Sequence, residues 1–342
     1  MRAAAGFASL ASLASFASLV TRVAVAALVM SACGGSPSAP VAPSPKVAGA
    51  PSAQADADEP HGTFTRGPGG VDTYVSIPWG FSTRSYVLEG PGGLVAIDTQ
   101  FLPSAAEEMI QLAEAATHKK FVLAVVLHAN PDKFNGTATF QRHGVKVVTS
   151  SQVKALLPAI HEKRMRSFYE RYQPDYPSDV AQPDAFGDKT TELSAAGLTL
   201  KLLVMGAGCS ESHVVVEHGV EHEKGLFVGD LVASQSHSWL EIGKTDEWLK
   251  RIAELEQRHP KRVYPGRGPE GDATKLLGDE KAYLNKAILL VGAEKPTMPV
   301  RPDALARVEQ GMIAAYPSYE FPVFLKIGLP AEWERQALAA KK

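Results

Sequence analysis

Four short segments of this 342-residue chain carry side chains that could bind a metal ion, and each follows directly on an apolar run. They read His-Ala-Asn-Pro-Asp-Lys at 128–133, Gly-Ala-Gly-Cys-Ser-Glu-Ser-His at 206–213, Gly-Asp at 229–230 and Pro-Gly-Arg-Gly-Pro at 265–269. Imidazole, thiolate and carboxylate are good zinc donors. Side chains at strand ends are held in place by the sheet, so the pattern predicts a site built from four strand ends.

The elements that would position these segments alternate between strands and helices. Apolar, β-branched runs predict strands at 85–89, 93–98, 121–127, 145–148, 198–205, 213–217, 225–229 and 262–264. Helical periodicity predicts helices at 103–117, 135–143, 151–172, 246–258, 271–293 and 302–315. This alternation, in two halves, favours a layered α/β domain.

The order and spacing of the motifs over residues 72–269 resemble the metallo-β-lactamase superfamily. Its landmarks are an opening hairpin, a His-x-His-x-Asp-His loop, a Gly-x-Gly-His loop, a Gly-Asp strand end and a Pro-Gly-His-Gly turn. The resemblance implies a four-layer αββα sandwich over 61–269, followed by a helical C-terminal extension over 270–342. It also implies hydrolytic chemistry assisted by zinc.

The metal-ligand positions of that family are only partly kept. Carried over by position, His128, Asp132 and Asp230 match family ligands. The changed positions are occupied by Asn130, Lys133, Cys209 and Arg267. The framework is therefore retained while the ligand set is altered, and two of the changes introduce a positive charge.

One zinc ion could still be bound by His128, Cys209 and Asp230, with Asp132 as a further donor. Each of these residues could also have a purely structural role. His128 could be a structural histidine at a strand end, Cys209 an inert buried thiol, and the two aspartates salt-bridge partners. His213 is expected to lie behind the ligands and support them.

A second zinc ion is not expected. Its ligand positions hold Asp132, Lys133, Arg267 and Asp230, and a guanidinium has no lone pair to offer. A cation ~4 Å from a dication is repelled by roughly 8 kcal/mol at an effective dielectric of 20. Lys133 and Arg267 are instead predicted to neutralise the two aspartates, in place of the ion.

Two functions fit this pattern. In the first, a metal-dependent hydrolase, zinc activates a water, Asp132 is the general base, and Lys133 or Arg267 holds an anionic part of the substrate. The substrate would be an ester, amide or phosphoester. The second is a non-catalytic protein that binds an anionic small molecule in a cationic pocket, chiefly through Arg267. A redox-responsive site at Cys209 is a third option.

Several neighbouring side chains have less defined roles. His237 could supply a replacement metal donor, and Asp98 could support the turn after its strand. Trp79 and Phe81 could form an aromatic flap over the site or belong to the core.

The N-terminal region predicts export and anchoring. Residues 1–32 have the basic start and short apolar run of a signal peptide. The Met-Ser-Ala-Cys sequence ending at Cys33 resembles the lipobox of bacterial lipoproteins, which implies lipidation of that cysteine. Residues 34–60 then form a Pro/Ala-rich linker. We expect a lipid-anchored protein of the bacterial cell envelope, at the outer membrane or periplasmic face, that contacts membrane only through its lipid.

Charge excludes one class of partner. The chain has 35 basic and 37 acidic residues and a net charge of -2, so the usual electrostatic basis for nucleic-acid binding is lacking.

Overall fold

The computed structural model describes residues 61–219 and 223–341. The predicted signal peptide, Cys33 and the linker 34–60 lie outside the described residues. The chain divides into Met1–Asp56 and Ala57–Lys342, and the described helices and strands all belong to the second unit. Among these helices, none combines the length and apolar character that a membrane crossing requires.

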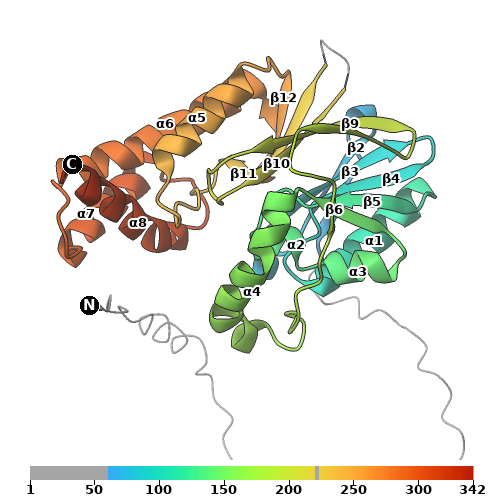
Figure 1. The fold of residues 1–342 in the computed structure, drawn as a ribbon, viewed down its shortest axis with the longest axis horizontal. Helices are drawn as coiled ribbons and strands as arrows, with labels where there is room; N and C mark the ends of the chain where they lie inside the picture. Colours follow the sequence, from blue (N-terminus) through green and yellow to red (C-terminus); the bar gives the residue numbers. More distant parts are fainter. Residues whose placement is uncertain (1–60, 220–222, 342) are drawn as a thin grey trace, which may run out of the picture. The chain divides into compact units, whose positions relative to one another are not determined.

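The first sheet has seven strands in sequential order (Figure 1). They are β1 (Thr63–Thr65), β2 (Val71–Val75), β3 (Arg84–Gly90), β4 (Gly93–Ile97), β5 (Phe121–Val125), β6 (Lys146–Thr149) and β7 (Asp184–Ala185). The strands β1 to β4 pair antiparallel, and β4 to β7 pair parallel. The parallel connections run through α1 (Pro103–Thr117), α2 (Pro131–Phe134), α3 (Thr137–Arg142) and α4 (Ser151–Tyr172).

The second sheet has six strands in the order β13-β12-β11-β10-β9-β8. They are β8 (Thr191–Ala195), β9 (Leu198–Met205), β10 (His213–His218), β11 (Gly225–Ala233), β12 (Arg262–Arg267) and β13 (Gly271–Asp272). All neighbours pair antiparallel except β11 and β12, which are parallel and joined through α5 (Thr245–Glu256).

The two sheets pack face to face. Their shared core joins Val87 and Val125 of the first sheet to Leu202, Val214 and Phe227 of the second. α1 and α3 cover the outer face of the first sheet, and α5 and α6 (Ala273–Ala293) cover that of the second (Figure 1). The predicted αββα layering is therefore confirmed.

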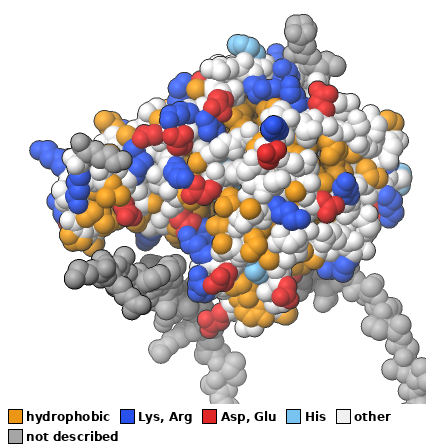
Figure 2. Space-filling view, viewed as in Figure 1, with side chains coloured by type: hydrophobic (Ala, Val, Ile, Leu, Met, Phe, Trp, Pro, Cys, Tyr) orange, Lys and Arg blue, Asp and Glu red, His pale blue; other side chains and the backbone are white. Residues whose placement is uncertain are grey.

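The C-terminal region is helical, as predicted. α6 is followed by α7 (Pro302–Ala315) and α8 (Val323–Ala339), and α6 packs against both. No separate bounds were predicted for α8 within this helical region. Its buried side follows helical spacing but includes Gly328 and Glu332, and Pro330 lies inside it, which weakens the apolar pattern. On the face shown in Figure 2, acidic and basic side chains are interspersed, in keeping with the near-zero net charge.

Candidate functional site

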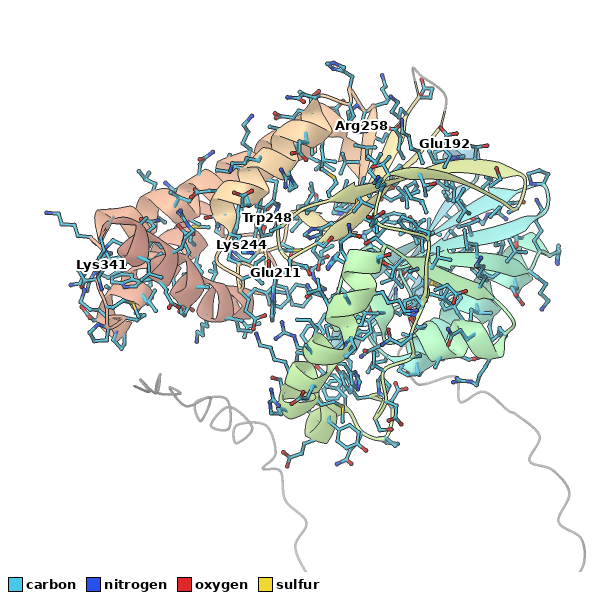
Figure 3. All side chains as sticks on the ribbon, in the orientation of Figure 1. Glu192, Glu211, Lys244, Trp248, Arg258 and Lys341 are labelled. Carbon is cyan, nitrogen blue, oxygen red and sulfur yellow. The ribbon has the colours of Figure 1, made fainter. Side chains whose placement is uncertain are left out.

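The four predicted segments come together at one end of the sandwich. His128 follows β5 of the first sheet, and its backbone forms an isolated β-bridge with His213, the first residue of β10 in the second sheet. The adjacent Val214 amide donates to the Leu127 carbonyl at 2.6 Å, which joins the two sheets at this point. The loop before β10 is tied on its outer side by an ion pair between Glu211 and Lys244, which lie side by side in Figure 3.

Lys133 lies at the centre of a buried charge cluster. Its fully buried ammonium is 2.8 Å from Asp132 Oδ2 and 2.9 Å from Asp230 Oδ1. At these distances the charge attraction between the ammonium and the two carboxylates holds the cluster together. Although burial opposes it, the neighbouring carboxylates raise the pKa of Lys133 above its ordinary value. Burial likewise opposes ionisation of Asp230, but Lys133 and Arg267 hold its pKa below the ordinary value.

Arg267, the last residue of β12, completes the cluster. Its Nη2 donates to Asp132 Oδ2 at 2.7 Å, and its Nη1 donates to the Phe81 carbonyl at 2.7 Å. The guanidinium also lies 5.3 Å from the ring centre of Phe324 and 5.7 Å from that of Phe321. The Arg267 guanidinium is therefore already paired and packed against aromatic rings.

The backbone beside the cluster approaches it closely. A Cβ on Gly266 would lie 2.1 Å from Asp230 Oδ1 and 2.6 Å from Lys133 Nζ. Only glycine fits there without displacing the ion pair. On the facing side, Gly229 has a φ of 55°, and a Cβ at that position would lie 2.9 Å from the His128 ring.

A second group of buried side chains lies next to the cluster. Donor atoms of His128, Cys209 and His213 all lie within 4.8 Å of one another, and all three residues are buried. Cys209 Sγ is 3.3 Å from His213 Nε2. Burial lowers the pKa of His213 to about 4 and places that of His128 well below its ordinary value. Burial, reinforced by the Asp230 charge, raises the pKa of the Cys209 thiol well above its ordinary value.

A pocket with an empty volume of about 390 Å³, including space open to solvent, reaches the charge cluster from outside. Its aromatic lining consists of Phe81, Phe101, Phe168, Trp239 and Phe324. Its polar lining consists of Asn130, Asp132, Arg164, Asp230 and Arg267. The two arginines are offset by two aspartates, and Arg164 is also paired with Glu241, so this pocket is charge-balanced. The expected cationic pocket is therefore not what the structure contains.

These positions test whether the residues fit zinc. The position between Asp132 and Asp230 does not fit zinc, because the Lys133 ammonium already occupies it. A metal ion there would be repelled by a positive charge at contact distance. The group of His128, Cys209 and His213 does fit in donor chemistry, since it offers two imidazoles and a thiol.

The predicted site residues thus form two adjacent groups. Asp132, Lys133, Asp230 and Arg267 share the charge cluster. The group next to it contains His128 and Cys209, linked to the cluster because the Asp230 amide donates to His128 Nε2 at 3.2 Å.

His213 has a more direct position than expected. It was predicted to stand behind the ligands, but its ring belongs to the group itself. The one signal in the sequence was its place at the first residue of a predicted strand. His237 lies elsewhere, with its Nδ1 3.0 Å from the Tyr283 hydroxyl, and it is absent from the His128 group among the described residues.

The aromatic residues before β3 have separate roles. Phe81 lines the pocket and packs edge-on against Phe101, with ring centres 5.0 Å apart. Trp79 is 45% exposed and packs on Tyr172 at 4.5 Å. Asp98 supports its turn as expected, because its Oδ1 accepts from the Leu127 amide at 2.8 Å.

The fold and the four converging loops define a metallo-β-lactamase-type sandwich, and comparison with known proteins agrees. The chain is 24% identical over 202 residues to the metallo-β-lactamase type 2 of Bacillus cereus, covering 57% of this chain and 70% of that protein. The solved metallo-β-lactamase from Pontibacter korlensis superposes with a TM-score of 0.53 at 24% identity, covering 66% of this chain and 99% of the other. The metallo-β-lactamase FIM-1 from Pseudomonas aeruginosa, in its mono-zinc form, gives 0.51 at 19% identity, covering 67% and 97%.

Residues 78–267 match the sequence model of the metallo-β-lactamase superfamily. This chain therefore belongs to that superfamily and has its hydrolase-like fold. Members of the superfamily typically depend on zinc, and the described residues include one group with suitable donors.

Proposed function

We propose that this protein is a non-hydrolytic member of its superfamily that binds a small, flat, mainly apolar molecule in the pocket beside Arg267. One observation carries the proposal: the Lys133 ammonium lies between the Asp132 and Asp230 carboxylates. By its resemblance to the superfamily, this is the position at which a second metal ion would be bound. An ammonium held by two carboxylates has no vacant coordination position at which a water could be activated.

The group of His128, Cys209 and His213 does not change this conclusion. None of these three residues lines the pocket among the described residues, and each is at most 1% exposed. A water activated at that group would be separated from a substrate in the pocket. The metal-dependent hydrolase expected from the sequence therefore has less support than the binding protein.

The chemistry of the pocket favours an uncharged ligand. Arg267 is paired with Asp132, and Arg164 contacts both oxygens of Glu241. A ligand carboxylate would have to displace one of these internal partners. The aromatic rings, in contrast, offer flat apolar faces that need no such exchange.

Hydrolysis is tested on the zinc-supplemented full chain with a chromogenic cephalosporin, p-nitrophenyl acetate and bis(p-nitrophenyl) phosphate. We expect no saturable turnover above that of the Asp132→Asn variant. Zinc-dependent, saturable turnover that Asp132→Asn abolishes would overturn the proposal and favour the hydrolase.

Binding is tested with the neutral dye N-phenylnaphthylamine and its anionic relative anilinonaphthalene sulfonate. We expect the neutral dye to bind at least as tightly as the anionic dye. Phe168→Ala should weaken binding of the neutral dye about tenfold, because a ring contact is lost. Leu289→Ala is the matched control, because Leu289 is 64% exposed and outside the pocket lining. Equal effects of the two variants, or much tighter binding of the anion, would contradict this assignment.

A further inference from the structure

We propose that Asn130, Asp132 and Asp230 form a hydrogen-bonding floor of the pocket, and that this floor selects an uncharged, amino-substituted nitrogen heteroaromatic ring. The inference rests on the proposed function and narrows it. The aromatic walls accept any flat apolar body, whereas the floor decides which polar edge that body must carry.

The first support is the Asn130 side chain, which lines the pocket and is only 8% exposed. Asn130 is the N-cap residue of α2, where an asparagine commonly accepts from the helix backbone, but its side chain makes no such bond. Within the described part of the chain, its carboxamide has no hydrogen-bond partner. Its oxygen and nitrogen are not fully enclosed either, so both face the pocket. A ligand could therefore bind this amide without displacing an internal partner.

The second support is that each carboxylate of the charge cluster keeps one oxygen unused. Lys133 and Arg267 both contact Asp132 at Oδ2, and Lys133 contacts Asp230 at Oδ1. Asp230 Oδ2 lies 4.0 Å from Arg267 Nε, beyond hydrogen-bond distance. Among the described residues, neither Asp132 Oδ1 nor Asp230 Oδ2 accepts a hydrogen bond, although both side chains are nearly buried. Because a carboxylate oxygen can only accept, a complementary ligand must donate to it.

These groups together define the polar edge of a complementary ligand. A carboxamide offers a donor and an acceptor side by side, the pattern with which asparagine binds the adjacent amino group and ring nitrogen of adenine. A ring nitrogen next to an amino group would accept from Asn130 Nδ2. The amino group has two hydrogens, one for Asn130 Oδ1 and one for a carboxylate oxygen. Rings of this kind also have the flat face that the aromatic walls can contact.

The charge of the cluster favours an uncharged amino group over an ammonium. The two carboxylates are already balanced by Lys133 and Arg267. A cationic ligand bonded to either carboxylate would lie close to the Lys133 ammonium and would be repelled by it. An uncharged amino group donates to the same oxygens without that cost.

The experiment compares two flat probes that are both uncharged at neutral pH and nearly equal in size. Binding of 2-aminoquinoxaline and 2-methylquinoxaline to the purified full chain is measured by isothermal titration calorimetry. The methyl group fills the same space as the amino group but cannot donate. We expect the unaltered chain to bind the amino probe about tenfold more tightly, because hydrogen bonds to nearly buried partners are gained.

Variants then assign this preference to the floor. Asn130→Ala should lower the affinity ratio of the two probes to about threefold or less, because the amino group loses one of its two acceptors. Asn130→Leu, which keeps the side-chain volume, should do the same. Phe168→Ala should weaken both probes alike and leave the ratio unchanged, since it removes only a ring contact. Asn285→Ala is the matched control, because Asn285 is exposed and outside the pocket lining.

Equal affinity of the two probes for the unaltered chain would overturn the inference, and so would an unchanged preference in both Asn130 variants. Circular dichroism checks that each variant is folded, and either Asn130 variant alone suffices. If both probes bind equally and Phe168→Ala weakens both, the proposed function stands without this floor. If neither probe binds, the inference and the proposed function both fail.

Discussion

The Lys133 ammonium lies 2.9 Å from the Asp230 carboxylate at a point where Lys133 is fully buried. A lysine is seldom found without solvent unless its charge is compensated, and here Asp132 provides the second partner at 2.8 Å. The cluster thus places a positive charge between two carboxylates, where the superfamily resemblance places a metal ion. The Lys133 side chain thus supplies the positive charge that balances the two carboxylates at that position.

Replacing Lys133 should destabilise the protein strongly. Lys133→Met keeps the approximate length of the side chain but leaves two buried carboxylates with only Arg267 nearby. Breaking a buried ion pair from one side costs about 3–5 kcal/mol, and urea unfolding at neutral pH should show a loss of that size. Lys120→Met is the control, since Lys120 is exposed and its pair with Glu114 should contribute ~1 kcal/mol or less. A loss below about 1 kcal/mol for Lys133→Met would contradict the central role of this charge.

Restoring histidines should restore metal binding at the same position. In Lys133→His/Arg267→His, two cations are replaced by imidazoles that can bind an ion jointly with Asp132 and Asp230. We expect this variant to bind one more equivalent of Zn²⁺ than the unaltered chain, measured by metal analysis after dialysis. Lys133→Met/Arg267→Met is the control and should gain none. No gain in the histidine variant would mean that the backbone, and not the charge, excludes the ion.

Most of the fold was predictable because its signals are local. Helix α1 begins at Pro103, as predicted, since proline suits the first turn. Strand β5 is a short apolar run, which is typical of a strand covered on both faces. Strands β1 and β2 were missed because β1 has three residues and β2 lies among glycines and polar residues.

The site was predictable in its charges but not in its contacts. The family resemblance places Asp132, Lys133, Asp230 and Arg267 at the ligand positions of one metal site. Charge balance then predicts that the two cations pair with the two aspartates, and these contacts are present. The role of His213 depends on the Gly206 carbonyl and on the approach of β10 to the end of β5. No local pattern encodes an approach between segments so distant in sequence.

A buried glutamate should make stability depend on pH near neutrality. Burial raises the pKa of Glu280 from 4.5 to about 8, although the Ala233 amide and Ser238 hydroxyl donate to it. Because the folded protein keeps the Glu280 proton more tightly than the unfolded chain does, the contribution of this group to stability is fully present below pH 4.5. It is lost as the pH rises from there through the folded pKa of about 8. In Glu280→Gln, whose amide can satisfy the same partners, the free energy of unfolding should fall less between pH 5 and 9. Parallel profiles of the two proteins in urea titrations would contradict the raised pKa.

A methyl group should not be tolerated at Gly266, where the backbone lies close to the charge cluster. In Gly266→Ala, the new Cβ would lie 2.1 Å from Asp230 Oδ1 and 2.6 Å from Lys133 Nζ, so the ion pair must move apart. Overpacking of this kind costs about 1–3 kcal/mol, measurable by urea unfolding. Gly278→Ala is the matched control, because that glycine lies within α6 with no atom within 4 Å of an added Cβ. Alanine is the better helix former, so this control should gain up to about 1 kcal/mol. Similar shifts in the two variants would show that Lys133 and Asp230 do not need the space that Gly266 leaves them.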